Sequence, residues 1–379
     1  MAREKWADAH GLLVRARRKP ADSFLKAEIF QKDAEALRAL GRFRESLSCS
    51  LSAHRIYRQL RIPTERISSL LGASACLRVL GRYAEARRLW ARDIHPHVSQ
   101  VDLERALVAR GQGKFAETRQ RLARAIKLLS RAGSVASLSD LQHAYWISGG
   151  LERFTGNFQK ARQAFQRAFR LARRSGDVSA EAFALCGLGG VERVLGFDRA
   201  SLSHYGAAHR LLKKKGDPFG EAYGLCGQAN VHRTFGDARR CLPLYRRSAA
   251  LYRRLGDESS EAFAHWGLGG SFRRLKQFRS AFVSYQKALR LFKKSKDERG
   301  VIMTHLGLAR WAEEQGQTDE ALRQGIRGLA VARRANLRYE TALARYEIGR
   351  RQRPLRPPFG ILKSSGISTA VLKRWRDIP

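Results

Sequence analysis

The sequence predicts an all-α protein, folded as a solenoid of about eight helix pairs with a capping helix at each end. The first observation is a glycine that recurs in the same sequence context, most often at an interval of 40 residues. It stands at Gly41, Gly81, Gly113, Gly156, Gly196, Gly236 and Gly316, and Lys276 replaces it once. The second observation is that each repeat holds two stretches with apolar residues at helical spacing. Repetition at this period is typical of an open helical array.

The helix pair of one repeat is clearest in residues 177–216. Its first stretch begins at Asp177, a residue suited to the N-cap, and ends at Gly196, which suits the left-handed position after a helix. The second stretch carries apolar side chains at helical spacing, namely Leu202, Tyr205, Ala208, Leu211 and Leu212. We therefore expect an aromatic ring and a small residue of the second helix to pack between neighbouring helices.

This pattern resembles the tetratricopeptide repeat. The residues that carry the resemblance are Leu188, Gly189, Gly196, Ser201, Tyr205 and Ala208, and again Leu268, Gly269, Ala281, Tyr285 and Ala288. The 40-residue length is similar to the variant in Pins/LGN-type scaffolds and kinesin light chains. The resemblance implies a right-handed superhelix. It also implies that the first helix of each pair lines a concave face, which in this family commonly binds peptides.

Four segments are expected along the chain. Residues 1–20 are predicted as an N-terminal cap helix, and residues 21–335 as the solenoid, with its best-formed repeats in 140–335. A C-terminal capping helix is expected at 336–352. Residues 353–379 form a basic tail that contains prolines, with one short helix expected at 368–376.

The amino-acid composition indicates which classes of partner the protein can have. The 379 residues include 73 Lys and Arg against 34 Asp and Glu, a formal charge of +39, which favours anionic partners. A bias of the genome toward arginine codons is the alternative explanation. No apolar run is long enough to span a membrane, and the N-terminus lacks the apolar core of a signal peptide. We therefore expect a cytoplasmic protein with reduced cysteines.

Catalytic motifs are absent from the sequence. The five cysteines form no metal-binding spacing with each other or with histidine, and no phosphate-binding loop, nucleophile elbow or zinc-protease motif occurs. The prediction is therefore a protein without catalytic residues, metal, cofactor or small-molecule substrate.

An arginine recurs three residues before the turn position in all repeats but the eighth. These residues, called the arginine ladder below, are Arg38, Arg78, Arg110, Arg153, Arg193, Arg233 and Arg273. Each lies seven residues after a position such as Trp146 or Trp266, so both share one helix face. Helices packed at about 10 Å would then present successive arginines to acidic or phosphorylated residues of an extended peptide.

A structural role for the ladder stays open beside the binding role. An arginine in the last turn of a helix meets the negative end of the helix dipole, which contributes roughly 0.3–1 kcal/mol. It can also pair with Glu152 or Glu192 of a neighbouring repeat. Such an arginine would be part of the scaffold and would not bind a partner.

Paired glycines raise a second question, because glycine weakens a helix. Close packing of the two helices of a pair accounts for the first glycine, as at Gly149, Gly189 and Gly269. The second glycine lies toward the predicted inner face, where it can form a groove floor that admits a partner's backbone. The groove-floor positions are Gly150, Gly190 and Gly270, with Asn230 in the same place of the sixth repeat.

A row of mostly aromatic residues runs beside the ladder. It comprises His143, Phe183, Tyr223, Phe263 and Met303, and the tryptophans of the ladder face are Trp146 and Trp266. The simpler interpretation places this row in the helix–helix core. If the rings are exposed, they offer a surface for a partner's side chains or a stacking platform for bases.

These observations lead to one function hypothesis and one alternative. The chain is predicted to be a scaffold or adaptor that binds an acidic or phosphorylated protein segment in an arginine-lined concave groove. The alternative is binding of RNA or single-stranded nucleic acid along the same basic groove. Salt dependence separates the two, because nucleic acid engages many phosphates at once.

Overall fold

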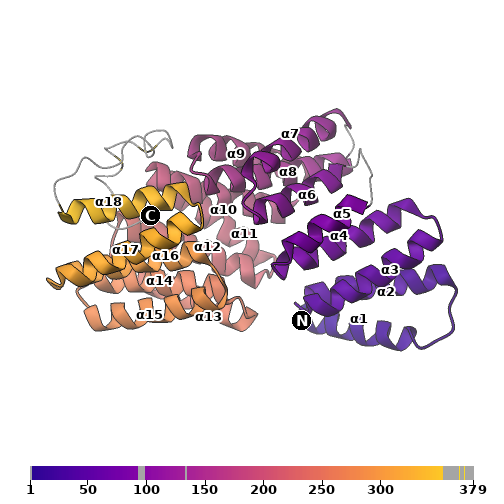
Figure 1. The fold of residues 1–379 in the computed structure, drawn as a ribbon, viewed down its shortest axis with the longest axis horizontal. Helices are drawn as coiled ribbons and strands as arrows, with labels where there is room; N and C mark the ends of the chain where they lie inside the picture. The colour runs from indigo at the N-terminus through magenta and orange to yellow at the C-terminus, as the bar shows by residue number, and fades with distance from the viewer. Residues whose placement is uncertain (1, 93–98, 133–134, 353–366, 368–370, 372–379) are drawn as a thin grey trace. The chain divides into compact units, whose positions relative to one another are not determined.

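The computed structural model describes residues 2–92, 99–132, 135–352, 367 and 371, and its regular structure in these residues is entirely α-helical (Figure 1). The chain divides into an N-terminal unit, Met1–Asp140, and a C-terminal unit that starts at Leu141, inside one helix. The all-α prediction is confirmed. The described helices form eight successive pairs with an additional helix at either end, as the repeat pattern predicts.

The N-terminal unit contains α1 (Ala2–Ala16), α2 (Ser23–Ala39), α3 (Phe43–Gln59), α4 (Pro63–Val79), α5 (Tyr83–Arg92), α6 (Ser99–Gly111) and α7 (Phe115–Ala132). Helix α1 lies in the segment predicted as an N-terminal cap and packs on α2. The pairs α2/α3, α4/α5 and α6/α7 then follow, with each helix packed against the next.

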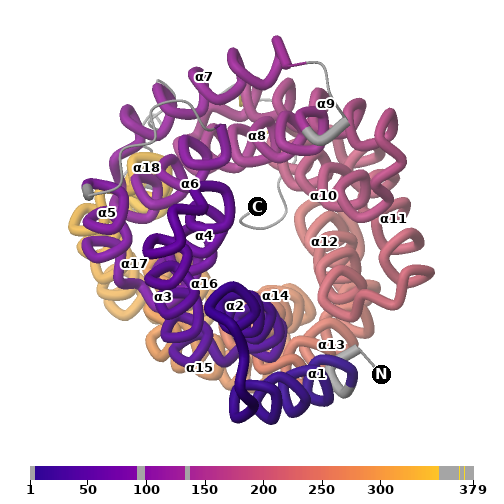
Figure 2. The backbone as a smooth tube through the Cα atoms, turned by 90° about the vertical axis from the view of Figure 1, so that its right-hand side faces the viewer, coloured from indigo at the N-terminus to yellow at the C-terminus, as the bar shows by residue number. Residues whose placement is uncertain are grey.

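The C-terminal unit contains α8 (Val135–Phe154) from Leu141 onward, α9 (Phe158–Ser175), α10 (Val178–Leu195), α11 (Asp198–Lys214), α12 (Pro218–Phe235), α13 (Ala238–Leu255), α14 (Glu258–Arg274), α15 (Phe278–Lys294), α16 (Glu298–Glu313), α17 (Thr318–Arg334) and α18 (Arg338–Gln352). In this unit α10, α12, α14 and α16 lie on the inner side of a curve (Figure 2). Their partners α11, α13, α15 and α17 lie on its outer side. The first helix of each pair therefore supplies the concave face.

Aspartates begin the first helices of the C-terminal unit. The side chain of Asp177 accepts a hydrogen bond from the backbone N–H of Ala180 at 3.0 Å, and Asp297 accepts one from Gly300 at 2.9 Å. Asp217 and Asp257 cap α12 and α14 in the same way. These side chains satisfy amide groups that have no partner within the helix.

The recurring turn position adopts the left-handed conformation in most repeats. The φ angle is +87° at Gly196 and +74° at Gly316, and Lys276 keeps a φ of +60° although it is not glycine. Gly236 differs, with φ −116° and ψ −149°. The glycine is therefore explained by backbone geometry at most turns, but not at the one after α12.

Close packing between helices accounts for the first of the two adjacent glycines in a first helix, as predicted. A Cβ atom added to Gly189 would stand 2.8 Å from the ring of Tyr205, and one added to Gly269 would stand 2.6 Å from the ring of Tyr285. Both tyrosines come from the second helix of the same pair. The recurring aromatic residue therefore fills the space that the glycine leaves.

The largest core cluster of the C-terminal unit extends from α9 to the last helix. It includes Phe158, Tyr285 and Tyr339, and Ile367 of the tail is also buried in it. Val371 packs against the same cluster and close to Gly196. Apart from these two tail residues, the predicted tail and its short helix at 368–376 lie outside the described residues.

No helix among the described residues combines the length and apolar character that crossing a membrane requires. The expected localisation therefore stays a prediction.

Candidate functional site

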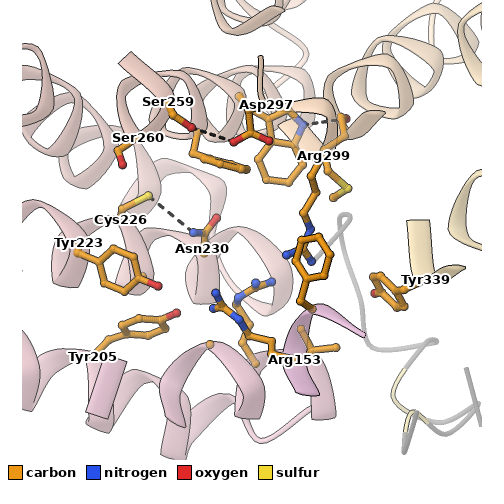
Figure 3. A pocket seen from close by; sticks show the side chains of 18 of the residues that line it. Arg153, Tyr205, Tyr223, Cys226, Asn230, Ser259, Ser260, Asp297, Arg299 and Tyr339 are labelled. Atoms are coloured by element: carbon orange, nitrogen blue, oxygen red, sulfur yellow. Dashed lines mark hydrogen bonds between the residues drawn. The ribbon is translucent and has the colours of Figure 1, made fainter. Parts of the chain in front are cut away.

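A cavity of about 400 Å³ opens on the concave side of the C-terminal unit (Figure 3). Most of its lining comes from the first helices of the pairs, from α8 to α18. Eight residues singled out in the sequence line it, namely Arg153, Gly190, Arg193, Tyr223, Asn230, Phe263, Trp266 and Met303. The structure thus brings part of the predicted ladder, floor and aromatic row to one place. Their roles in binding stay predictions.

Arg193 of α10 has an unusual environment. Its side chain is half-buried and lines the cavity, but its Nε and Nη1 atoms are buried and have no hydrogen-bond partner among the residues that the structure describes. Burial lowers the pKa of this guanidinium, and the positive charge of Arg233 also lowers it. A buried cation without acceptors is unfavourable, so Arg193 is a strong candidate for contact with an anion.

Arg153 of α8 lies on the same side of the cavity as Tyr205 and Tyr223 (Figure 3). A Cβ atom added to Gly190 would stand 3.1 Å from Arg153 Nη1 and 3.1 Å from the Tyr205 hydroxyl. The missing side chain of Gly190 therefore makes room for the protein's own guanidinium and phenol. Its predicted function, to admit a partner's backbone, is not needed to explain it.

Among the ion pairs of the described residues, none involves Arg153 or Arg193. The third arginine of the cavity, Arg299, differs because its Nε donates to Oε1 of the buried Glu340 at 2.7 Å. Two of the three lining guanidinium groups therefore lack a carboxylate of the scaffold.

The carboxylate that lines the cavity, Asp297, is engaged elsewhere. Its Oδ1 caps α16, and its Oδ2 accepts a hydrogen bond from the Ser259 hydroxyl at 2.8 Å. In Figure 3 Asp297 and Arg153 lie on opposite sides of the cavity, with Asn230 between them. Asp297 is therefore placed to hold the helix start, away from Arg153.

Two further polar groups border the cavity. The hydroxyl of Tyr339 in α18 is buried without a hydrogen-bond partner, and burial raises its pKa, so it stays a neutral donor. Asn230 uses its Oδ1 to accept the Tyr245 hydroxyl at 2.7 Å. Its Nδ2 makes a long contact of 3.7 Å with the Cys226 sulfur. Tyr339 and Asn230 thus add potential donors beside the arginines.

Other ladder residues contact the scaffold. Arg78 pairs with the buried Glu104, at 3.2 Å between Nε and Oε1, and Arg273 forms an ion pair with Glu314. Arg233 is 1% exposed, and its Nε donates to the Tyr245 hydroxyl at 3.1 Å. The remaining members, Arg38 and Arg110, are half-buried. The ladder is therefore not a uniform row of solvent-facing cations.

The remaining predicted positions are also placed. His143 is exposed and its ring stacks on half-buried Trp146, with 6.2 Å between the ring centroids. Phe183 is half-buried, Gly150 is partly exposed and Gly270 is buried. Trp266 donates its indole N–H to the Met303 carbonyl at 2.9 Å, which ties α14 to α16. Of these six positions, only Trp266 lies in the lining of the cavity.

The proposed pairing of ladder arginines with Glu192 is not what the structure shows. Glu192 is buried and binds Arg162 from the second helix of the preceding pair and His204 from the second helix of its own pair. Sequence reasoning also missed Tyr339 and Arg299. The sequence offered a signal for Arg299 alone, because it follows the N-capping Asp297 and lies at the start of a first helix.

Comparison with known proteins identifies the repeat. The family model described as Tetratricopeptide repeat matches residues 220–294 and 260–334. The chain contains tetratricopeptide repeats in residues 220–334. No curated protein sequence matches it significantly.

Two solved structures show the fold similarity of this tetratricopeptide-repeat protein. One is a Rap protein complexed with Competence and Sporulation Factor, with a TM-score of 0.60, 9% identity, and coverage of 90% of this chain and 99% of that chain. The other is NprR in complex with its cognate peptide NprX, with a TM-score of 0.59, 11% identity, and coverage of 80% and 90%. At these identities the likeness shows the fold alone.

The cysteine thiols of the tetratricopeptide-repeat protein are shielded from solvent. The five cysteines are buried and free, and burial raises the pKa of the Cys226 thiol to about 11. A thiol with such a pKa stays protonated and is a poor nucleophile. No cluster of His, Cys, Asp and Glu in the described part of the chain could hold a metal ion.

Proposed function

We propose that the C-terminal unit binds a segment of a partner protein and that an acidic or phosphorylated residue of this segment enters the cavity at Arg153 and Arg193. The observation that carries the proposal is the buried Nε and Nη1 of Arg193, which have no acceptor in the part of the chain that the structure describes. An anionic oxygen at this place would form charge-assisted hydrogen bonds, the strong class of such bonds. The protein would act as an adaptor without catalysis.

The location of the cavity supports this proposal. It lies on the side formed by the first helices, which the family commonly uses for peptides. Phe263 and Trp266 add apolar area beside the arginines, and the apolar part of a peptide side chain can pack there. One of the two similar structures is NprR in complex with its cognate peptide NprX.

Nucleic acid is the alternative ligand, and the site gives it less support. The ladder was expected to contact phosphates in succession, but Arg78 and Arg273 hold carboxylates of the protein. A strand that engages several phosphates shows a log–log salt slope of roughly −0.7 for each phosphate neutralised. Binding at one cavity should instead give a shallow slope.

The proposal is tested with an array of synthetic peptides of three kinds, phosphorylated, acidic and neutral. Peptides that bind are then measured by fluorescence anisotropy against the unmodified protein and Arg193→Met, which keeps the side-chain length and removes the charge. We expect Arg193→Met to weaken binding at least about tenfold, because charge-assisted bonds in a desolvated site contribute about 1.5–3 kcal/mol.

Arg170→Met is the matched control. Arg170 is exposed on α9, so this substitution removes the same charge outside the cavity. It should bind peptides like the unmodified protein. If neutral peptides bind as well as anionic ones, or Arg193→Met binds normally, the proposal is wrong. A salt slope steeper than about −3 with an RNA ligand would favour nucleic acid.

A further inference from the structure

Two guanidinium groups of the cavity, those of Arg153 and Arg193, have no carboxylate partner among the described ion pairs, and the lining carboxylate of Asp297 lies on the opposite side of the cavity from Arg153 (Figure 3). Arg299 is neutralised by Glu340, and Asp297 is engaged by Ser259 and by the start of α16. A ligand that neutralises Arg153 and Arg193 from within one cavity must therefore bring two negative charges close together.

The geometry also limits the number of anionic groups that can bind. The next ladder residue, Arg233, has its guanidinium carbon 4.2 Å from the ring centroid of Trp266 and its Nε bonded to Tyr245. Arg273, one repeat further, is paired with Glu314. The two arginines that follow along the ladder are thus held by the scaffold, so a series of carboxylates finds no matching series of arginines.

Donor atoms of the cavity residues outnumber the two oxygens of a carboxylate. Arg193 Nε and Nη1 and the Tyr339 hydroxyl are all buried without an acceptor among the described residues. Arg153 adds a second guanidinium over Gly190. A phosphate group has three terminal oxygens, each of which accepts hydrogen bonds, whereas a carboxylate has two.

From these observations we infer that the cavity is a seat for one phosphate monoester in its dianionic form, with Arg153, Arg193 and Tyr339 as the groups that bind it. This inference rests on the proposed function and selects a phosphorylated residue over an acidic one. The organic part of the ester, which carries the phosphate, lies against Phe263 and Trp266. The cavity, at about 400 Å³, is within the usual range for small ligands.

The first test compares two small probes of similar shape, phenyl phosphate and benzoate, by isothermal titration calorimetry with the full chain. We expect phenyl phosphate to bind at least about tenfold more tightly at neutral pH, because it alone can carry two charges. Equal affinity for the two probes overturns the inference. Peptide binding through a carboxylate would then still be possible, so the proposed function survives that result.

The second test uses pH. A phosphate monoester loses its second charge with a pKa of about 6, so its affinity should fall about tenfold from pH 7 to pH 5. Benzoate keeps its charge over this range, as carboxylates do. It therefore reports any change in the protein. A fall that benzoate shares, or no fall at all, contradicts the inference.

The protein groups that face the seat come from seven helices. The titratable ones are Tyr205, Tyr223, Cys226, Tyr252, Tyr339 and Asp297. The charged ones are Arg153, Arg193, Arg299 and, behind them, Arg233 and Glu340. Burial raises the pKa of Tyr205, Tyr252, Cys226 and Tyr339. These four groups therefore stay neutral between pH 5 and pH 7. Any effect of the other titratable groups on anion binding appears in the benzoate control.

Variants locate the seat. Arg193→Met and Arg153→Met should each lower the affinity for phenyl phosphate at least tenfold, and Arg193→Lys should retain part of it because it keeps the charge but not the fork of donors. Arg170→Met should have no effect. Circular dichroism melts show whether each variant is folded. If Arg193→Met does not fold, the affinity of Arg193→Lys for phenyl phosphate decides whether Arg193 binds the ligand. Binding unchanged in all three cavity variants would overturn the assignment.

Two sources of a phosphate remain to be separated, a phosphorylated side chain and free phosphate. Inorganic phosphate is the probe for the second, and we expect it to bind at least about tenfold more weakly than phenyl phosphate, because it leaves the aromatic wall uncovered. A peptide from the array is then compared as phosphorylated, glutamate-substituted and unmodified forms. Equal binding of the first two contradicts the inference alone. Failure of every peptide contradicts the proposed function.

Discussion

The guanidinium of Arg233 lies over the indole ring of Trp266, with its carbon 4.2 Å from the ring centroid. Trp266 belongs to the repeat that follows Arg233, so the contact joins α12 to α14. One repeat earlier, Arg193 has Cys226 at the equivalent position of the following repeat. A thiol is much smaller than an indole and leaves space beside Arg193. The same ladder position is thus filled at one level and open at the next.

Arg233→Met is expected to destabilise the protein. The change removes the cation–π contact with Trp266 and the hydrogen bond to Tyr245, whose hydroxyl is buried. These losses together correspond to about 2–4 kcal/mol in the free energy of unfolding. Urea denaturation followed by circular dichroism measures it. Stability equal to that of the unmodified protein would mean that the stacked arginine contributes nothing net.

Arg193→Met should behave in the opposite way in the absence of ligand. The unmodified protein holds a buried guanidinium with two unpartnered nitrogens, and a methionine of similar length removes that cost. We expect the free energy of unfolding to stay equal or rise by up to about 1 kcal/mol, as when a binding residue is replaced for stability. A clear loss of stability would show that Arg193 is needed by the scaffold.

The fold was predictable because its signals are local and repeated. A glycine with positive φ, an aspartate cap and an aromatic residue at helical spacing each act within one helix pair, and the chain states them many times. Gly236 shows the limit of this reasoning, because its sequence context matches the other repeats but its backbone does not adopt the left-handed conformation. There the local pattern does not determine the turn.

The site was predictable only in part, because it depends on differences between repeats. The sequence shows Trp146, Cys186, Cys226 and Trp266 at one repeated position, but the cavity follows only once neighbouring helices are packed together. Tyr339 comes from α18, far along the chain, and only the curve of the C-terminal unit brings it to Arg193. Contacts between residues so far apart in the chain cannot be predicted from the sequence of a single repeat.

Gly269→Ala tests the close packing of the helix pairs. The added methyl group would lie 2.6 Å from a ring atom of Tyr285, which is 1% exposed and cannot move away freely. We expect a loss of about 1–3 kcal/mol in the free energy of unfolding. Gly11→Ala in α1 is the matched control, because nothing lies within 4 Å of the new atom. It should be neutral or stabilising by up to about 1 kcal/mol, and a similar loss in both variants would contradict this account.

Stability is expected to fall as the pH decreases from neutral toward 5. Burial, and then the charge of Lys287, lowers the pKa of His265 from its ordinary 6.5 to about 4. The unfolded chain therefore binds a proton in this range that the folded protein does not, so acid favours unfolding. Urea midpoints measured from pH 7 to pH 5 should show a smaller decrease for His265→Gln. Buried His305 and half-buried His10 and His232, whose pKa values are also lowered by burial, contribute in the same direction.

Cys226→Trp should close the cavity and remove ligand binding without unfolding the protein. The substitution copies the residue that stands one repeat later, where the indole of Trp266 covers Arg233. Cys226 lines the cavity and its side chain borders open space, so an indole can fill this volume and stack on Arg193. The expected readout is a loss of peptide or phenyl phosphate binding, with a melting temperature equal to or above that of the unmodified protein.

Cys241→Ser is a control, since Cys241 lies at a buried position outside the lining and its change leaves the cavity open. Full binding by folded Cys226→Trp would show that the ligand lies elsewhere on the C-terminal unit.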